Sequence, residues 1–384
     1  MNFLGLISRC KDEFFVKEFC DYYLSQGVDL IYIIDDDSND KSIYDKINDK
    51  RVKIIYENNI IKKKYSDTLY KEIKSNFKWM IYCDIDEFIT TKKNITNTIR
   101  NELNTTFKDV DCVKVPWVMM SCNNLQKNPK SILSANIYRW NHDNKHEVSN
   151  IRKFRCRYNK IECKCIFKTD KFGSIYDHHP QHNSEPVLIS DSIYNESQEV
   201  KKNLNFSRNG DSKSEKEKNI FFKNLREENI KNGFLLCYHY RIISVENCIN
   251  KIKRNLWYNN KRYKLDNLMS FDFAEIIDET LKYKYSLINQ NIVEESEIED
   301  DTLKDIVPSD YPDNVKESEI QDNVLSDYPD NVKESEMQDN VPSDYPDNVK
   351  ESEIQDDNVK ESEIQDDNVK ESEIQDDNVK ESEI

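Results

Sequence analysis

The chain has 384 residues and a formal net charge of −17, but its acidity is confined to one end. Residues 293–384 hold 33 Asp and Glu against 7 Lys, so residues 1–292 carry a net charge of +9. A uniformly acidic protein is therefore excluded, because a mildly basic body precedes a strongly acidic tail. The basic residues of the body are scattered among acidic ones, which argues against a nucleic-acid-binding surface.

The acidic tail repeats a short unit. Two nearly identical units of 17 residues begin at Val307 and Val324, and from Asp357 the repeat shortens to ten residues. Its apolar residues are sparse, and it contains no Trp, Phe or Cys. Because such a segment cannot bury enough apolar surface to offset its chain entropy, we expect a disordered acidic tail over residues 293–384. The tail is either simply solvated or a tether for a basic partner or for the basic body itself.

The body, residues 1–292, is long enough for one large domain. Its opening, MNFLGLIS, is apolar for only a few residues before Arg9, which is too short for a signal peptide or a membrane span. We therefore expect a cytoplasmic protein without a transmembrane anchor, or one of the virion or host cytoplasm if its source is a virus. The cysteines, including Cys163 and Cys165, are expected to be structural thiols rather than a zinc site.

The first 115 residues alternate between short apolar runs and amphipathic segments. Strands are expected at residues 2–7, 30–34, 52–56, 79–83 and 113–115. Helices are expected at residues 13–25, 67–77 and 94–103. Strands that are apolar on both faces are typical of sheets covered by helices on both sides. The order therefore predicts a Rossmann-like α/β fold with a mainly parallel sheet and flanking helices.

The second part of the body is less regular. Residues 116–182 show short β-like runs, and the charged residues 195–232 are expected to form helices and a loop. A late strand is expected at residues 234–240, and Ser244 is suited to cap the helix that follows it. The apolar stripe of that helix is typical of core packing.

Polar side chains cluster where three of the predicted strands end. These clusters are Ser8-Arg9, residues 35–40 (DDDSND) and residues 84–87 (DIDE). Because the carboxyl ends of parallel strands meet at one edge of a sheet, where ligands bind, we expect the three clusters to lie together. Asp84 and Asp86 are separated by one residue, so both carboxylates can face a single cation.

Carboxylate oxygens are hard ligands that suit Mg²⁺ or Mn²⁺. A cation held by one or two carboxylates keeps positions open for phosphate oxygens, which would account for charge at the end of a buried strand. The alternative is that the DIDE segment is only a solvated turn. The second acidic cluster, after another strand of the same sheet, favours the metal site.

The stretch ISRCKDEFFVKEFCDYYLSQGVDLIYIIDDDSND resembles the opening of nucleotide-sugar-dependent glycosyltransferases of the GT-A fold, most closely the family 2-like and family 92-like group. In that group an Arg-Asn-Glu stretch precedes a helix with Glu-Trp, and a strand then ends in Asp-Asp-x-Ser-x-Asp. The stretch WMIYCDIDEFI resembles the metal-binding DxD segment of the group. Further matches come in the same order at residues 115–117, 164–168, 177–180 and 238–251.

The resemblance implies an enzyme that moves a sugar from a nucleoside-diphosphate sugar to the hydroxyl of a glycan, protein or lipid acceptor, with inversion. Residues 1–115 would be the nucleotide-sugar half and residues 116–292 the acceptor half. Asp35 or Asp36 would hydrogen-bond the base or ribose, and Arg9 would lie beside the nucleotide.

The resemblance also implies a bound Mn²⁺ or Mg²⁺. Asp86 would bind the ion directly, and Asp84 would bind it through water or reach the ribose. A late third ligand is expected, with His239 favoured and His179 second. His179 is also the candidate for a group near the acceptor that acts as a general base.

Two other functions fit parts of the sequence. A haloacid dehalogenase-like phosphohydrolase also uses a strand that ends in Asp-x-Asp, with the first aspartate as nucleophile. That pattern has Thr or Val two residues after the second aspartate, where this chain has Phe88. A non-enzymatic interaction protein, whose folded body only presents the acidic tail, is the other alternative.

Overall fold

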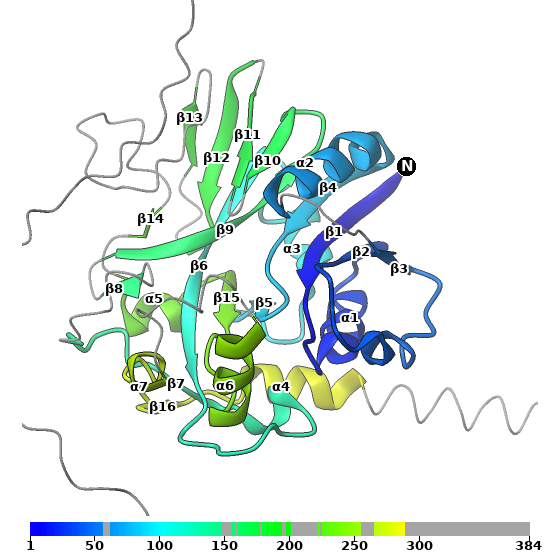
Figure 1. Cartoon of the computed structure of the whole chain (residues 1–384). Coiled ribbons are helices and arrows are strands. Elements are labelled where there is room, and N and C mark those ends of the chain that lie inside the picture. The colour runs from blue at the N-terminus through cyan, green and yellow to red at the C-terminus, as the bar shows by residue number, and fades with distance from the viewer. Residues whose placement is uncertain are drawn as a thin grey trace, which may run out of the picture. The chain divides into compact units, whose positions relative to one another are not determined.

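The computed structural model (Figure 1) describes the first part of the body almost continuously and its second part with gaps. The described ranges are residues 1–56, 62–146, 156–157, 160–176, 179–183, 185–193, 197–200, 221–222, 225–254 and 265–288. The chain divides into two compact units, Met1–Ser309 and Asp310–Ile384. The predicted boundary at residue 293 and the predicted disordered tail lie outside the described residues.

Four parallel strands form the sheet of the first half, in the order β3-β2-β1-β4. Their bounds are Asn2–Cys10 (β1), Leu30–Asp35 (β2), Val52–Tyr56 (β3) and Phe77–Tyr82 (β4). In the paired register Gly5 lies opposite Leu30 and Cys10 opposite Asp35, so β1 and β2 end at the same level. This half confirms the predicted Rossmann-like α/β arrangement.

Helices cover both faces of this sheet. The helices are α1 (Val16–Ser25), α2 (Lys62–Ile73) and α3 (Ile99–Asn104). Tyr82 hydrogen-bonds Ser66 of α2 at 3.2 Å, whereas the next residue, Cys83, contacts Tyr23 of α1 at 3.6 Å. Because successive side chains of an extended chain point to opposite faces, α1 and α2 lie on opposite sides of the sheet.

Gly27 ends α1 as the sequence predicts. Its φ of 88° lies in the left-handed region, and its N–H donates to the carbonyl of Leu24 at 3.1 Å. The N–H of Val28 donates to the carbonyl of Tyr23 at 3.1 Å, which completes a Schellman ending. A Cβ atom at Gly27 would lie 2.6 Å from Cβ of Arg100, so the position accepts only glycine without rearrangement.

The second half extends the sheet through an antiparallel strand. β9 (Lys160–Lys168) lies between β4 and β6 (Cys112–Ser121) and is antiparallel to both. β12 (Val187–Asp191) then pairs in parallel with β6, and β13 (Ser197–Val200) pairs antiparallel with β12. Residues 197–200 therefore form a strand in the charged region for which helices and a loop were predicted.

The long strand β6 changes partner along its length, which curls the sheet. Residues Cys112 to Pro116 pair with β9, whereas Trp117 to Met119 pair in parallel with β15 (Leu235–His239). β15 also pairs antiparallel with β5 (Glu87–Thr91). β6 crosses the predicted division at residues 115–116, so the two halves share this strand.

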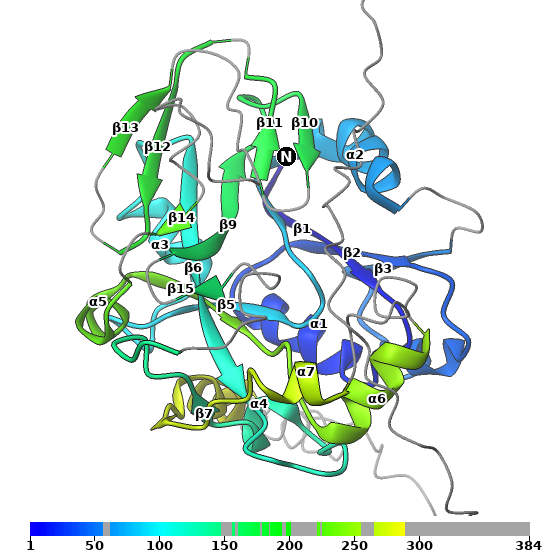
Figure 2. The same cartoon turned by 60° about the vertical axis from the view of Figure 1, so that its left-hand side comes forward.

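Shorter elements complete the described part. The remaining helices are η1 (Lys41–Tyr44), η2 (Lys74–Asn76), α4 (Ile132–Ala135), α5 (Glu227–Asn232), α6 (Val245–Arg254) and α7 (Leu265–Met269), and residues 280–288 are also helical. The remaining strands are β7 (Tyr138–Arg139), β8 (Cys156–Arg157), β10 (Ser174–Tyr176), β11 (His179–Gln181), β14 (Phe221–Phe222) and β16 (Ile276–Ile277). In both views α4, α6 and α7 lie at the end of the molecule opposite β10–β13 (Figure 2).

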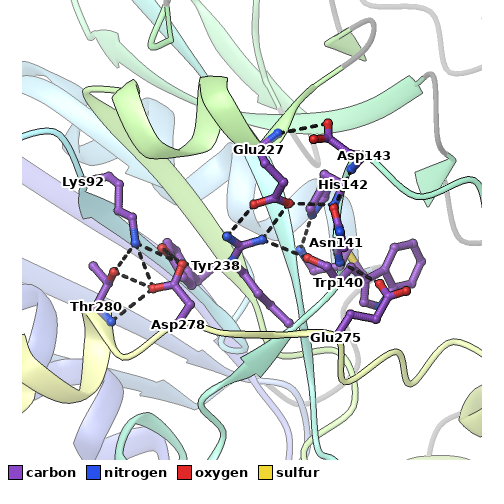
Figure 3. Close-up of polar contacts among 12 residues, drawn as sticks. Lys92, Trp140, Asn141, His142, Asp143, Glu227, Tyr238, Glu275, Asp278 and Thr280 are labelled. Carbon is purple, nitrogen blue, oxygen red and sulfur yellow. Dashed lines mark hydrogen bonds and ion pairs between the residues drawn. The ribbon is translucent and has the colours of Figure 1, made fainter.

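The last described segment is held by buried charges. Asp278 accepts hydrogen bonds from Lys92 at 3.0 Å and from Tyr238 at 2.9 Å, and both can be followed in Figure 3. It also accepts hydrogen bonds from Thr280 and contacts the guanidinium of Arg139, which pairs with Glu227 at 2.7 Å. This network joins β5, β7, β15 and α5 to the segment after β16.

Nine of the ten cysteines are described as buried thiols without a disulfide, which agrees with the expected structural role. In the described ranges, no helix combines the length and the hydropathy that crossing a membrane requires.

Candidate functional site

The carboxyl ends of β1, β2 and β4 meet at one edge, as predicted. The N–H of Asp36 donates to the carbonyl of Cys10 at 2.8 Å, which joins the end of β2 to the end of β1. The N–H of Cys83 donates to the carbonyl of Ile7 at 3.3 Å, which joins β4 to β1. From β1, the guanidinium of Arg9 approaches the carboxylate of Asp84 to 4.0 Å.

The loops that follow β1 and β2 are fixed to each other. Asp12, whose φ is 52°, accepts hydrogen bonds from the N–H groups of Asn39 at 2.6 Å and Asp40 at 3.1 Å. In return its own N–H donates to the hydroxyl of Ser38 at 3.0 Å. The pair of loops therefore forms a rigid rim beside Asp36.

Asp35 and Asp36 have different environments. Asp35 is 2% exposed, and its carboxylate accepts from the hydroxyl of Tyr44 at 2.7 Å and from the N–H of Ser38 at 3.3 Å. Asp35 thus holds the turn that follows β2. Asp36 is half-buried, so of the two it is the better placed to reach a ligand.

The DIDE segment forms a tight turn between β4 and β5. The carboxylate of Glu87 accepts from the N–H of Asp84 at 2.7 Å. The ammonium of Lys164, on β9, lies 2.9 Å from Asp84 and 3.0 Å from Glu87. Lys164 and Glu87 are fully buried, whereas the Asp84 side chain is 42% exposed. Lys164 therefore holds this turn from its buried side, and Asp84 stays accessible to solvent.

Burial and neighbouring charges shift the pKa values of Lys164 and Glu87 in this turn. Burial alone would lower the pKa of Lys164, but the carboxylates of Asp84 and Glu87 raise it well above its ordinary value. Burial also raises the pKa of Glu87, and the nearby carboxylates of Asp84 and Asp86 add to this while Lys164 opposes it. Lys164 therefore keeps its positive charge at neutral pH.

Asp86 lies between a histidine and a lysine. Its Oδ1 is 3.6 Å from Nε2 of His239, and its Oδ2 accepts from the ammonium of Lys251 on α6 at 2.9 Å. Its backbone carbonyl accepts from the N–H of Tyr240 at 2.8 Å, which fixes the turn to the end of β15. Burial alone would raise the pKa of Asp86, but the positive charge of Lys251 lowers it below its ordinary value.

His239 is held in a neutral form. The pairing of β15 with β5 places it opposite Glu87, and its ring lies 4.4 Å from that of Trp117. Burial lowers the pKa of His239 to about 4 although Asp86 opposes the shift, so the imidazole is neutral at pH 7. Its Nδ1 is buried and makes no hydrogen bond within the described part of the chain. A neutral imidazole is the form that binds a metal ion.

The side chains at this site supply some of the ligands that a divalent cation needs. Asp86 and His239 present a carboxylate oxygen and a neutral ring nitrogen to each other, which is a suitable pair of ligands for Mn²⁺. Asp84 is directed instead to Lys164 and Arg9. Within the described ranges, no group of three or more His, Cys, Asp or Glu side chains is arranged to hold a metal ion. Two of the three predicted ligands thus face each other, and Asp84 is separated from Asp86 by a single residue in the chain.

His179 lies in a different part of the fold. It belongs to β11, in the separate two-stranded sheet with β10, where its ring is 5.7 Å from that of Tyr176. It is buried, with Nδ1 3.2 Å from the carbonyl of Pro180. Its expected roles as general base and alternative metal ligand stay predictions. The neighbouring His178, in the same expected motif, lies outside the described residues.

The structure adds two residues to the site, Lys164 and Lys251. Sequence reasoning included both in the matched motifs but gave neither a role. Each is far in sequence from its aspartate partner, by 80 residues for Lys164 and 165 residues for Lys251. The available signal was a lysine within a buried strand and a lysine on the apolar side of a helix, since both positions require a nearby negative charge.

A cavity of about 730 Å³ lies elsewhere. Its lining includes Lys92, Arg139, Asp278 and Tyr283, and none of the predicted site residues. It adjoins the charged network of Figure 3, where Lys92 and Arg139 already have carboxylate partners. This cavity therefore belongs to the attachment of the last segment rather than to the edge that carries Asp84 and Asp86.

Neither a family model nor a curated protein matches the sequence. Solved structures with some likeness include residues 1–349 of S. aureus TarS, at 13% identity and a TM-score of 0.24 over 44% of this chain. The aligned part spans about half, 47%, of that TarS chain. Two further solved structures show a similar degree of likeness.

These two are a 4-diphosphocytidyl-2C-methyl-D-erythritol synthase from Anaerococcus prevotii and HddC from Yersinia pseudotuberculosis. The first has 10% identity and a TM-score of 0.24, and covers 44% of this chain and 72% of its own. The second has 12% identity and a TM-score of 0.25, and covers 45% of this chain and 79% of its own. At these TM-scores the function has to be argued from the site itself.

Proposed function

We propose that the protein is a metal-dependent glycosyltransferase that moves a sugar from a nucleoside-diphosphate sugar to an acceptor hydroxyl. The observation that carries the proposal is the meeting of Arg9, Asp36, Asp84, Asp86 and His239 at one edge of the sheet. A turn that is only solvated would not require a neutral buried histidine, His239, beside Asp86. It would also not require the buried Lys164 in contact with the turn. The arrangement instead suits a ligand that carries phosphate and a cation.

The nucleoside would bind at the ends of β1 and β2. The fixed loops after these strands leave Asp36 half-buried beside the rim, where a carboxylate can accept hydrogen bonds from a ribose or a base. Arg9 lies between this rim and Asp84, which suits contact with phosphate oxygens. Asp35 supports the turn rather than the ligand.

Asp86 and His239 would hold Mn²⁺ or Mg²⁺, with Asp84 contributing through water or binding the ribose. Such an ion neutralises charge on a diphosphate leaving group. The chain itself fixes Asp86 through Tyr240 and Lys251, so the carboxylate is oriented before any ligand binds.

The reaction would be a direct displacement at the anomeric carbon. A bond forms between that carbon and the acceptor oxygen, the bond to the diphosphate oxygen breaks, and the acceptor proton passes to a base. Such a displacement inverts the configuration of the sugar carbon. The sequence predicts His179 as the base, but it lies on β11 in a separate sheet, and no described contact brings it to Asp84 or Asp86. A loss of kcat in His179→Gln with nucleotide binding unchanged would support that role.

A thermal-shift screen tests the proposal. The full-length chain is heated with Mn²⁺ and uridine, guanosine or cytidine diphosphate sugars in turn. One nucleotide series should raise Tm, and the rise should vanish in Asp86→Ala but remain in Glu72→Gln, an exposed carboxylate on α2. If no series raises Tm of the wild type, the proposal is wrong.

A further inference from the structure

Each aspartate of the DIDE turn already has its own cationic partner. Lys164 lies 2.9 Å from Asp84, and Lys251 lies 2.9 Å from Asp86. Arg9 adds a third cation 4.0 Å from Asp84. The two aspartates therefore face three cations, so the turn has no excess of negative charge to attract a bare divalent ion.

Lys251 is the cation closest to the candidate ligand pair. Its ammonium binds Oδ2 of the same carboxylate whose Oδ1 faces His239. A divalent ion held by Asp86 and His239 would share that carboxylate with the ammonium. Two cations on one carboxylate repel each other, and this repulsion is strong where the side chain is only 15% exposed.

A diphosphate removes this repulsion, because it brings negative charge that both cations can share. We propose that the site takes a divalent cation together with a nucleoside diphosphate rather than alone, and that Lys251 is the residue that imposes this coupling. The proposal deepens the proposed function and rests on it. It identifies the metal–diphosphate complex, rather than the free ion, as the ligand that the site recognises.

The position of Lys251 supports a role in binding rather than in folding alone. It stands on α6, whose first turn is fixed by the Ser244 hydroxyl, which accepts from the N–H of Asn247 at 2.9 Å. The Lys251 side chain is 10% exposed, and its ammonium binds the Asp86 carboxylate directly. Lys164, in contrast, is fully buried and also holds Glu87, so its removal would disturb the fold.

Titration of Mn²⁺ followed by electron paramagnetic resonance tests the coupling in the full-length chain. Mn²⁺ is added alone, and then with UDP, GDP or CDP, each in a separate series. For the wild type, at least one of these nucleotides should tighten Mn²⁺ binding by roughly tenfold or more, the size expected when a like charge near the ion is compensated.

Lys251→Gln should bind Mn²⁺ alone about tenfold more tightly than the wild type, and the nucleotide should add little. Lys251→Arg keeps the charge and should behave as the wild type does. Lys253→Gln, an exposed lysine on the same helix, is the matched control and should change nothing.

Two results would overturn the coupling. One is a wild type that binds Mn²⁺ equally well with and without every nucleotide. The other is a folded Lys251→Gln that binds Mn²⁺ alone more weakly, because Lys251 would then only orient Asp86. If the Lys251→Gln chain does not fold, the wild-type titration still decides. A wild type that binds neither Mn²⁺ nor any nucleotide contradicts the proposed function itself.

Discussion

Lys164 is the residue on which the charge balance of the DIDE turn depends. It is fully buried, yet its ammonium contacts two carboxylates at 2.9 and 3.0 Å. Burying a charge is costly, and the cost is offset here only because the partners are also charged and in contact. The ion pairs of Lys164 are therefore needed to hold the turn in a conformation in which Asp84 stays accessible to solvent.

We expect Lys164→Met to lower the free energy of unfolding by about 3–5 kcal/mol, because it leaves Glu87 buried without its cation. The double variant Lys164→Met/Glu87→Gln should recover most of that loss. Guanidinium denaturation measures both. Lys17→Met, which removes an exposed ion pair with Asp21, is the control and should cost less than about 1 kcal/mol. A double variant as unstable as the single one would contradict this account.

Lys284 is a second buried lysine, and it faces mainly neutral groups. Its ammonium donates to Thr91 at 2.6 Å, to the carbonyl of Asn97 at 2.9 Å and to Gln26 at 3.1 Å. Burial lowers the pKa of Lys284 to about 7, and Glu102 opposes the shift. Between pH 7 and the ordinary pKa of lysine, the unfolded chain therefore binds more protons than the folded one.

Stability should consequently rise with pH through this window. Relative to Lys284→Met, the wild type should gain about 2 kcal/mol in its free energy of unfolding between pH 7 and pH 9. Denaturation at the two pH values measures the difference. Lys282→Met, an exposed neighbour, should show the same pH dependence as the wild type. A difference between the wild type and Lys284→Met that does not change with pH would show that Lys284 stays charged.

At the scale of elements, the end of α1 sets the path of the chain into β2. Gly27 has a φ of 88°, and a Cβ atom added at Gly27 would clash with the side chain of Arg100. The guanidinium of Arg100 in turn donates to the carbonyl of Gly27 at 2.9 Å and pairs with Asp29. The helix ending and α3 are therefore fixed to one another at this glycine.

We expect Gly27→Ala to lower the free energy of unfolding by about 2 kcal/mol or more, because a left-handed conformation costs an alanine about 1–2 kcal/mol before any clash. Thermal denaturation measures the change. Gly173→Ala serves as the comparison, since its φ is not positive and the nearest atom would be 3.3 Å away. An equal effect of the two substitutions would mean that the left-handed ending is unimportant.

The parallel strands could be predicted from sequence because each is a short apolar run. The predicted strand at residues 52–56 coincides with β3, and those at 30–34 and 79–83 differ from β2 and β4 by one or two residues. The position of the three polar clusters at one edge of the sheet followed from the predicted parallel topology alone. The helix expected at 94–103 begins only at Ile99, where Thr98 caps it.

The antiparallel strand β9 could not be predicted in the same way. It inserts between β4 and β6, so its pairing joins residues about 50 to 90 positions apart, and no local pattern specifies such partners. The ion pair of Lys164 depends on that insertion, since Lys164 reaches Asp84 only from β9. The pair of Lys251 depends likewise on the placement of α6. The motifs therefore included both lysines but could not assign either of them to its aspartate.

At the scale of the whole molecule, the described site lies within the basic body. Every side chain proposed to bind the nucleotide or the metal precedes residue 252, and the last described residues, 280–288, are attached through Lys284 to the first half. The acidic tail, with 33 acidic residues in residues 293–384, is a separate feature of the sequence. This separation leads to a prediction about truncation.

A chain that ends at residue 292 should fold and should keep its metal-dependent stabilisation by a nucleoside-diphosphate sugar, because no group of the proposed site is removed. A second truncation at Ser309 follows the boundary between the two compact units. Thermal shift with Mn²⁺ and the donor series compares both with the full chain. If binding disappears with the tail in both truncations, then the tail takes part in the site. If it disappears only in the shorter chain, the body extends beyond residue 292.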